Sequence, residues 1–235
     1  MFTHVFEEDA TLIINKIFNG DNFVLSRYAD GEYHVMNALQ CNGCDGWEVG
    51  PEDGVLAEAL TKAFKHTEDN YFYGISCPCC DSPKYTWLKE NIKQGWERVT
   101  YSNLFVNGNY SKFKSMVEIL ERPVVLLVNE AADEVKYPFD VVDRLLVPGD
   151  VIKWYRDSSQ EVEEAVISLA KKYTDTLFFI SAGPLSELSI SLMYQANPNN
   201  SYIDVGSSLD YWTHQRYTRL YQNPTSEFST RMCSF

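Results

Sequence analysis

Short apolar runs that alternate with amphipathic segments restrict the fold of this chain more than any other feature. Residues 123–128 and 177–180 are apolar throughout, which is typical of strands buried on both faces of a sheet. Between them, Val162, Val166 and Leu169 recur at the spacing of one helix face. This alternation predicts an α/β, Rossmann-like fold in which a mostly parallel sheet has helices on both faces.

The same patterns place further elements along the 235 residues. Helices are expected over residues 11–18, 54–66, 83–95, 111–121, 160–173 and 185–196, and strands over residues 22–26, 71–75, 99–106, 123–129, 176–180 and 201–205. Residues 136–150 have no clear pattern. No linker or repeat divides the chain, so we expect one domain over residues 1–235. The apolar runs are too short for a membrane span.

The acidic composition narrows the classes of partner. A formal net charge of −13 disfavours generic binding to a nucleic acid. A run of basic residues between Lys84 and Lys114 leaves a local nucleic-acid contact open, although a solvated helix face is the favoured explanation. The first nine residues contain acids and lack a secretory pattern, so we expect a cytoplasmic protein, bacterial or made in an infected host cell.

Six cysteines in such a chain are expected to be reduced thiols. Cys41 and Cys44 have the spacing of zinc ligands, and Cys77 and Cys79 could complete a set of four. The cluster at residues 77–80 is irregular, however, and contains no second Cys-x-x-Cys. A zinc site is therefore not favoured, and the purified protein is expected to hold less than stoichiometric zinc.

Three polar loops follow predicted strands, at residues 27–32, 181–184 and 206–210. Ligands of open α/β sheets bind outside the carboxyl ends of the strands, so these loops are expected to meet at one site. The first loop contains Arg27 and the acids Asp30 and Glu32, whose oxygen atoms suit Mg²⁺ or Mn²⁺. From the two acids alone, an ordinary polar turn is the simpler explanation.

The segment Phe23-Val-Leu-Ser-Arg-Tyr-Ala-Asp-Gly-Glu32 resembles the RYGDGE segment of the GT-D glycosyltransferases, with Ala29 in place of the usual first glycine. This family was long catalogued only as a domain of unknown function. Further similar pieces follow in the order of the family: Cys44-Asp-Gly46, Phe105-Val-Asn-Gly-Asn-Tyr110, Ser181-Ala-Gly-Pro184, and Ile203-Asp-Val-Gly-Ser-Ser-Leu-Asp210 followed by Thr218-Arg-Leu-Tyr221. The resemblance covers residues 20–222.

The resemblance implies an Asp-x-Glu motif, matched by Asp30 and Glu32, that binds a divalent cation and a nucleotide diphosphate. Breaking the sugar–phosphate bond places charge on the diphosphate, which Mn²⁺ or Mg²⁺ together with Arg27 can stabilise. The other candidates for binding the donor are Ser181, Gly183, Ser207 and Arg219. The implied reaction moves a sugar from a nucleotide-diphosphate sugar, a UDP-sugar in the first instance, to the hydroxyl of a glycan or of a hydroxymethylated base in phage-type DNA.

The acceptor hydroxyl needs a base unless the leaving phosphate takes its proton. Asp210 ranks first because its loop should face the donor, and Asp45 and Glu130 follow in that order. His34 and His214 are weaker candidates. Aromatic residues that could stack on a base or a sugar are Tyr28, Tyr33, Trp47, Tyr211 and Trp212.

Two other functions are compatible with these residues. A metal-dependent phosphohydrolase would also use carboxylates beside phosphate-binding loops. A non-catalytic nucleotide-binding module could have the same fold. Transfer of a sugar to a defined acceptor separates the glycosyltransferase from both.

Overall fold

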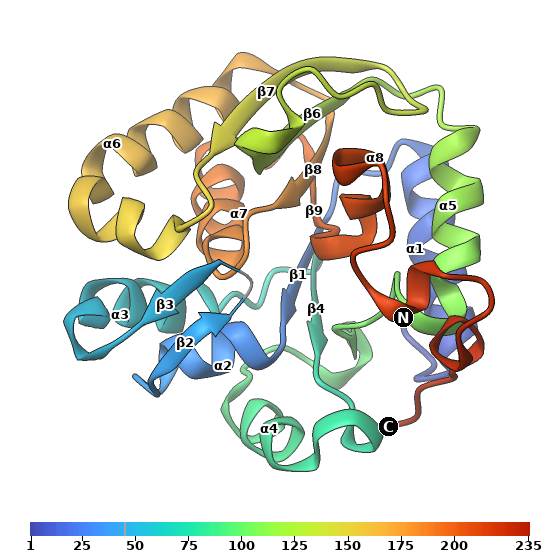
Figure 1. Ribbon diagram of the computed structural model, residues 1–235, viewed down its shortest axis with the longest axis horizontal. Helices are drawn as coiled ribbons and strands as arrows, with labels where there is room; N and C mark the ends of the chain where they lie inside the picture. The colour runs from blue at the N-terminus through green and yellow to red at the C-terminus, as the bar shows by residue number, and fades with distance from the viewer. Residues whose placement is uncertain (45) are drawn as a thin grey trace.

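A seven-stranded sheet lies at the centre of the computed structural model, which describes residues 1–44 and 46–235 (Figure 1). Its order is β5-β4-β1-β9-β8-β6-β7, and each neighbouring pair is parallel. The strands are β1 (Val24–Tyr28), β4 (Tyr71–Ile75), β5 (Val99–Tyr101), β6 (Val124–Asn129), β7 (Val141–Val147), β8 (Leu177–Ser181) and β9 (Ser201–Asp204). The prediction of a mostly parallel sheet is confirmed.

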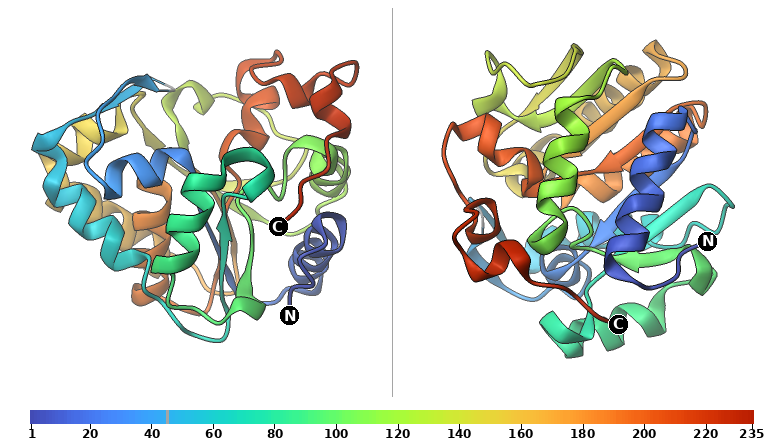
Figure 2. Two further views of the ribbon diagram at one scale, coloured as in Figure 1. Left: turned by 90° about the horizontal axis from the view of Figure 1, so that it is seen from below. Right: turned by 90° about the vertical axis from the view of Figure 1, so that its right-hand side faces the viewer.

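Helices cover both faces of this sheet (Figures 1 and 2). They are α1 (Phe6–Asn19), α2 (Asp30–Met36), α3 (Gly54–Ala63), α4 (Pro78–Asn91), α5 (Tyr110–Glu118), α6 (Val151–Lys172), α7 (Leu185–Ala196) and α8 (Asp210–His214). An antiparallel hairpin of β2 (Cys41–Cys44) and β3 (Trp47–Val49) precedes α3. Within the described part of the chain, no helix is both long and apolar enough to cross a membrane.

The alternation of side chains along β6 shows why both faces are covered. Val125 and Leu127 belong to the core that α3, α6 and α7 share with the sheet. Val124 and Leu126 belong to the core on the opposite face, where α1 and α5 pack. Successive residues of a strand point to opposite faces, so a strand that is apolar throughout needs a helical layer on each side.

Several boundaries differ from the prediction. β7 lies in the stretch without a clear pattern, because most of its side chains are only half-buried at the edge of the sheet. α6 begins at Val151, well before the predicted residue 160. The prediction missed its first turns because Ser158 is non-helical (φ −147°, ψ 40°) and interrupts the periodicity of the helix. α1 and α4 begin earlier than expected, and β5 ends at Tyr101.

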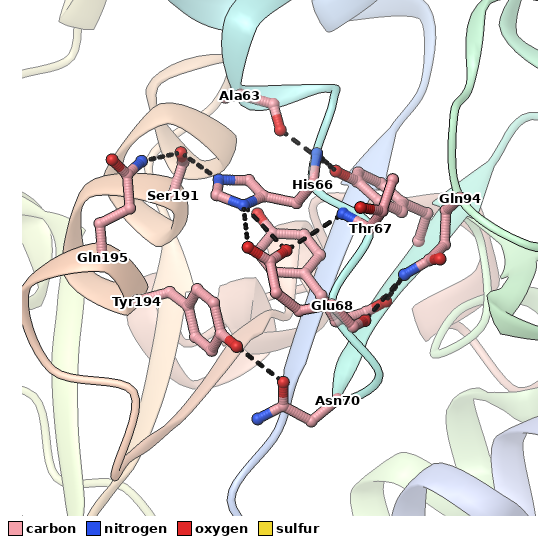
Figure 3. A network of polar contacts seen from close by, with 11 residues as sticks. Ala63, His66, Thr67, Glu68, Asn70, Gln94, Ser191, Tyr194 and Gln195 are labelled. Atoms are coloured by element: carbon pink, nitrogen blue, oxygen red, sulfur yellow. Dashed lines mark hydrogen bonds and ion pairs between the residues drawn. The ribbon is translucent and has the colours of Figure 1, made fainter.

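The connection between α3 and β4 is held by a network of polar side chains (Figure 3). His66 Nε2 lies 2.8 Å from Ser191 Oγ of α7, and Tyr194 Oη of the same helix donates to Asn70 Oδ1. Gln94 Nε2 donates to the carbonyl oxygen of Tyr71, the first residue of β4. These contacts lie at the amino end of β4, so they stabilise the scaffold at the end opposite to the polar loops.

Candidate active site

A cavity of about 640 Å³ lies at the carboxyl ends of the parallel strands. The segments that follow β1, β8 and β9 all contribute to its wall, so the structure brings the three polar loops together. The lining includes these residues singled out from the sequence: Arg27, Asp30, Glu32, Ser181, Gly183, Ser207, Asp210, Arg219, His34, His214 and Trp47. Asp45 lies outside the described residues. Glu130 is exposed, and its neighbour Asn129 lines the cavity instead.

The two acids of the Asp-x-Glu motif lie in a helix rather than in a loop, which corrects the sequence prediction. β1 continues to Tyr28, and α2 begins at Asp30 directly after Ala29. Asp30 is exposed to the cavity, whereas Glu32 is buried and its Oε2 accepts a hydrogen bond of 2.7 Å from the Ala29 amide. Glu32 therefore caps its own helix as well as lining the cavity.

Burial raises the pKa of Glu32 to about 7, against the opposing effect of the Ala29 hydrogen bond. The nearby carboxylates of Asp204 and Asp30 also raise this pKa. A cation beside Glu32 would favour its ionised form by the reverse effect. The protonation of Glu32 therefore depends on the charges beside it.

Arg27 lies within β1 and is held from several sides. Its Nε is 2.9 Å from Asp204 Oδ2, and Nη1 donates to the Ser102 carbonyl oxygen at 2.7 Å. Its backbone amide donates to Glu187 Oε1 of α7 at 3.2 Å. The guanidinium group is thereby fixed in the cavity wall, with part of its charge offset by Asp204.

Asp204 and Glu187 were missed by the sequence analysis. Asp204 is the last residue of β9, and Glu187 lies in the first turn of α7; both are buried. Burial, together with the carboxylates of Asp204 and Glu32, raises the pKa of Glu187. An acid inside an apolar strand or on the apolar face of a helix is the signal that would have identified them.

Gly206 permits the close approach of the third loop to Arg27. Its φ of +45° is in the left-handed region, and a Cβ atom there would lie 2.3 Å from Arg27 Nη2. The Gly206 amide donates to Asp204 Oδ1 at 2.7 Å. The loop after β9 is therefore built around the ion pair of Arg27 and Asp204.

The turn between β8 and α7 forms a second wall. Gly183 has a φ of +54°, and a Cβ atom there would lie 3.2 Å from Trp47 Nε1. A Cβ atom on Gly31 would lie 3.3 Å from the same indole ring. Trp47 therefore packs against the turn at Gly183 and against Gly31 of α2, and it is only 6% exposed, so the structure assigns it to packing rather than to stacking on a ligand.

Tyr28, a second stacking candidate, is also part of the core. Its side chain is fully buried, with its ring 4.4 Å from that of Phe64 and 5.8 Å from that of Tyr73. Tyr33, Tyr211 and Trp212 are half-buried and stay candidates for stacking.

The segment after β9 and the C-terminal segment close the third wall. Asp210 begins α8, and its Oδ2 accepts a hydrogen bond of 2.8 Å from Thr218 Oγ1. Ser207 Oγ lies 2.8 Å from Tyr221 Oη, and Gln222 Nε2 donates to the Ser207 carbonyl oxygen. Arg219 lies between these contacts in the chain and lines the cavity.

An all-parallel α/β sheet defines a Rossmann-like protein, and its acidic cavity lies at the carboxyl ends of the strands, the edge where such folds bind their ligands. Comparison with solved structures describes the fold more closely. It is similar to a structure of domain of unknown function 1792, described as a distinct glycosyltransferase fold, with a TM-score of 0.57 and 12% identity over 88% of this chain and 80% of that chain.

A selenomethionine-substituted structure of the same domain gives a TM-score of 0.56 at 11% identity, with the same coverage of both chains. At these identities the likeness shows a shared fold. The resemblance found in the sequence is confirmed at that level. A scan against protein-family models and a search of curated proteins found no match.

Proposed function

We propose that this protein is a metal-dependent glycosyltransferase that moves a sugar from a nucleotide-diphosphate sugar, in the first instance a UDP-sugar, to an acceptor hydroxyl. The observation that carries the proposal is the meeting of Asp30 and Glu32 with the turn before α7 and with Arg219 in one cavity. The glycosyltransferase fold of similar structures supports it. A volume of about 640 Å³ is in the range of small-molecule sites.

Asp30 and Glu32 would hold Mn²⁺ or Mg²⁺. Asp204 already pairs with the guanidinium group of Arg27, and Asp30 and Glu32 add two further carboxylates to the same wall, so a cation fits its charge. Two carboxylates together with the oxygens of a diphosphate are a common way for proteins to hold such ions. The bound metal would neutralise charge that develops on the departing diphosphate.

The remaining donor contacts come from the chain itself. Ser181 and Gly183 precede the amino end of α7, where backbone amides and the helix dipole favour an anion. Arg219 would add a charged donor to the phosphates, and the Ser207 hydroxyl would reach the donor from the opposite wall. The fixed position of Arg27 lets it stabilise the same charge without rearrangement.

Asp210 would accept the proton of the acceptor hydroxyl. Thr218 holds its carboxylate at the cavity wall, on a segment separate from the metal ligands. Asp45 is the second candidate for this role. If the leaving diphosphate takes the proton instead, Asp210 would position the acceptor.

The ion pairs made by the basic residues between Lys84 and Lys114 favour a glycan over DNA as the acceptor. Most of these cations already have acidic partners, which leaves little positive charge for a polyanion. The ion pairs are Lys84–Asp81, Arg98–Asp69, Lys112–Glu7 and Lys114–Glu118. Transfer to DNA with hydroxymethylated bases is the alternative acceptor reaction.

A panel of nucleotide sugars tests the proposal, with thermal stability measured with and without Mn²⁺ and products analysed in the presence of glycan or hydroxymethylated DNA acceptors. We expect one donor to raise the melting temperature only with Mn²⁺, since a ligand of the folded state stabilises it. The same donor should then lose its sugar to an acceptor. Release of inorganic phosphate without sugar transfer would indicate a phosphohydrolase, and binding without turnover a non-catalytic module.

A further inference from the structure

The C-terminal tail ends beside α4 (Figure 1). Four cysteine sulfurs meet in this region. Cys77 precedes α4, Cys79 and Cys80 lie in its first turn, and Cys233 comes from the end of the chain. Their Sγ atoms all lie within 4.8 Å of one another. The Sγ distances are 3.2 Å for Cys77–Cys79, 3.9 Å for Cys79–Cys80 and 3.9 Å for Cys80–Cys233.

This group differs from the ligand set considered from the sequence. Cys41 lies in β2 and is disulfide-bonded, which also differs from the expectation of reduced thiols throughout. Cys233 supplies the fourth sulfur, although 153 positions separate it from Cys80. A ligand so distant in the chain belongs to no local motif. The spacing at residues 77–80 therefore gave no sign that a fourth cysteine completes a group of four sulfurs.

We propose that Cys77, Cys79, Cys80 and Cys233 bind one zinc ion as thiolates. A tetrahedral zinc with Zn–S bonds of about 2.3 Å holds its sulfurs about 3.8 Å apart. The separations of 3.2 to 3.9 Å lie close to this value. Thiolates of an iron–sulfur cluster bind separate iron atoms and would lie farther apart, so the spacing favours a single ion.

Nitrogen donors surround the sulfurs as thiolates require. Asn103 Nδ2 lies 2.7 Å from Cys233 Sγ and 3.8 Å from Cys80 Sγ. The backbone amide of Ser234 donates to Cys79 Sγ at 3.4 Å. Such donors orient metal-bound thiolates and partly offset their charge.

The metal would link the C-terminal tail to the segment between β4 and α4 and to the first turn of α4, and so hold the tail against the sheet. The Gly108 amide donates to the Arg231 carbonyl oxygen, and Ser234 bridges to Val5 near the N-terminus. The ring of Phe235 packs at a tilt against that of Tyr101 of β5, with ring centres 4.0 Å apart. Zinc would add a covalent link to these weak contacts, at the end of a segment whose residues 218, 219 and 221 line the cavity.

Metal analysis of the full-length protein, purified under reducing conditions and without chelator, tests this inference independently of any transfer activity. We expect about one zinc per chain in the wild type, in place of the less than stoichiometric zinc expected from the sequence alone. Cys79→Ser and Cys233→Ser should each lose most of it, whereas the matched variant Cys41→Ser should retain it. Wild-type protein that stays zinc-free after incubation with Zn²⁺ and removal of the excess would overturn the proposal, as would equal zinc in all four proteins.

A titration with Co²⁺ needs no variant and covers the case in which a serine variant fails to fold. Cobalt bound by four thiolates in a tetrahedron gives strong sulfur-to-metal charge transfer and intense ligand-field bands. We expect both to saturate at about one equivalent in the reduced wild-type protein. Weak bands of octahedral cobalt, or no change on titration, would contradict the four-sulfur site.

Discussion

At the scale of single residues, the acids of the cavity divide into two kinds. Asp30 and Asp210 reach the cavity from the starts of two separate helices, whereas Glu187 and Asp204 are buried around Arg27. The buried pair fixes the wall, and the other two are placed to act on ligands. Variants of the two kinds should therefore fail in different measurements.

Asp210→Asn should lower sugar transfer on the order of a hundredfold while donor affinity changes little. A base that acts only on the acceptor proton stabilises the transition state without holding the donor. Donor affinity, melting temperature and turnover should be measured on one preparation. Normal turnover with a lowered melting temperature would instead make Asp210 a structural partner of Thr218.

Glu187→Gln and Glu187→Ala are a matched pair of variants that tests how Glu187 stabilises the buried wall of the cavity. The raised pKa of Glu187 favours its protonated form, and glutamine keeps an oxygen for the Arg27 amide, so this variant should cost less than about 1 kcal/mol in unfolding free energy. Alanine leaves a cavity and an unpaired amide, and should cost about 2–4 kcal/mol. Chemical denaturation measures both. Equal losses would show that the wall depends on the carboxylate charge.

At the scale of elements, the turns between strands and helices determine how the walls of the cavity pack together. The turns at Gly183 and Gly206 both have left-handed backbone, and each brings backbone close to a large side chain, Trp47 or Arg27. These contacts link the hairpin β2–β3 and the strand β1 to the loops that follow β8 and β9. A methyl group at either glycine should therefore also displace the side chain of Trp47 or Arg27 that packs against it.

Gly206→Ala should destabilise the protein by about 1–3 kcal/mol, because its Cβ would collide with Arg27 and its φ is positive. Gly54→Ala is the control: no atom lies within 4 Å of its Cβ position, and it lies in α3. There, alanine should be neutral or slightly stabilising. Similar melting temperatures for the two variants would contradict the packing described for the third loop.

The elements also show what the sequence could and could not predict. β4 and α7 were placed at their observed bounds because both are regular and well buried. β7 was missed because an edge strand does not need a continuous apolar pattern. The acids of the first loop were found through their motif, but Asp204 and Glu187 depend on contacts between segments distant in the chain, as Cys233 does. The apolar segments around Asp204 and Glu187 mark these acids as unusual, but no local pattern shows which residues they contact.

At the scale of the whole molecule, the C-terminal tail runs across the surface to end beside α4 (Figure 2). Its residues 218, 219 and 221 line the cavity, and Cys233 belongs to the cysteine group. Removal of zinc with a strong chelator under reducing conditions should speed amide hydrogen exchange in residues 216–235 far more than in α7. Mass spectrometry of the exchanged protein measures this. Equal exchange in the tail with and without zinc would show that the other contacts suffice to hold it.

The central claim is that the Asp-x-Glu motif holds a metal for a nucleotide-sugar donor. Titration of the donor into wild-type protein, Asp30→Asn and Glu32→Gln, each with and without Mn²⁺, tests it most directly. We predict that Mn²⁺ tightens binding to the wild type and that either variant weakens the Mn²⁺-dependent affinity by more than about tenfold, or about 1.4 kcal/mol, while both stay folded. Wild-type affinity in both variants, with the same response to Mn²⁺, would contradict the claim.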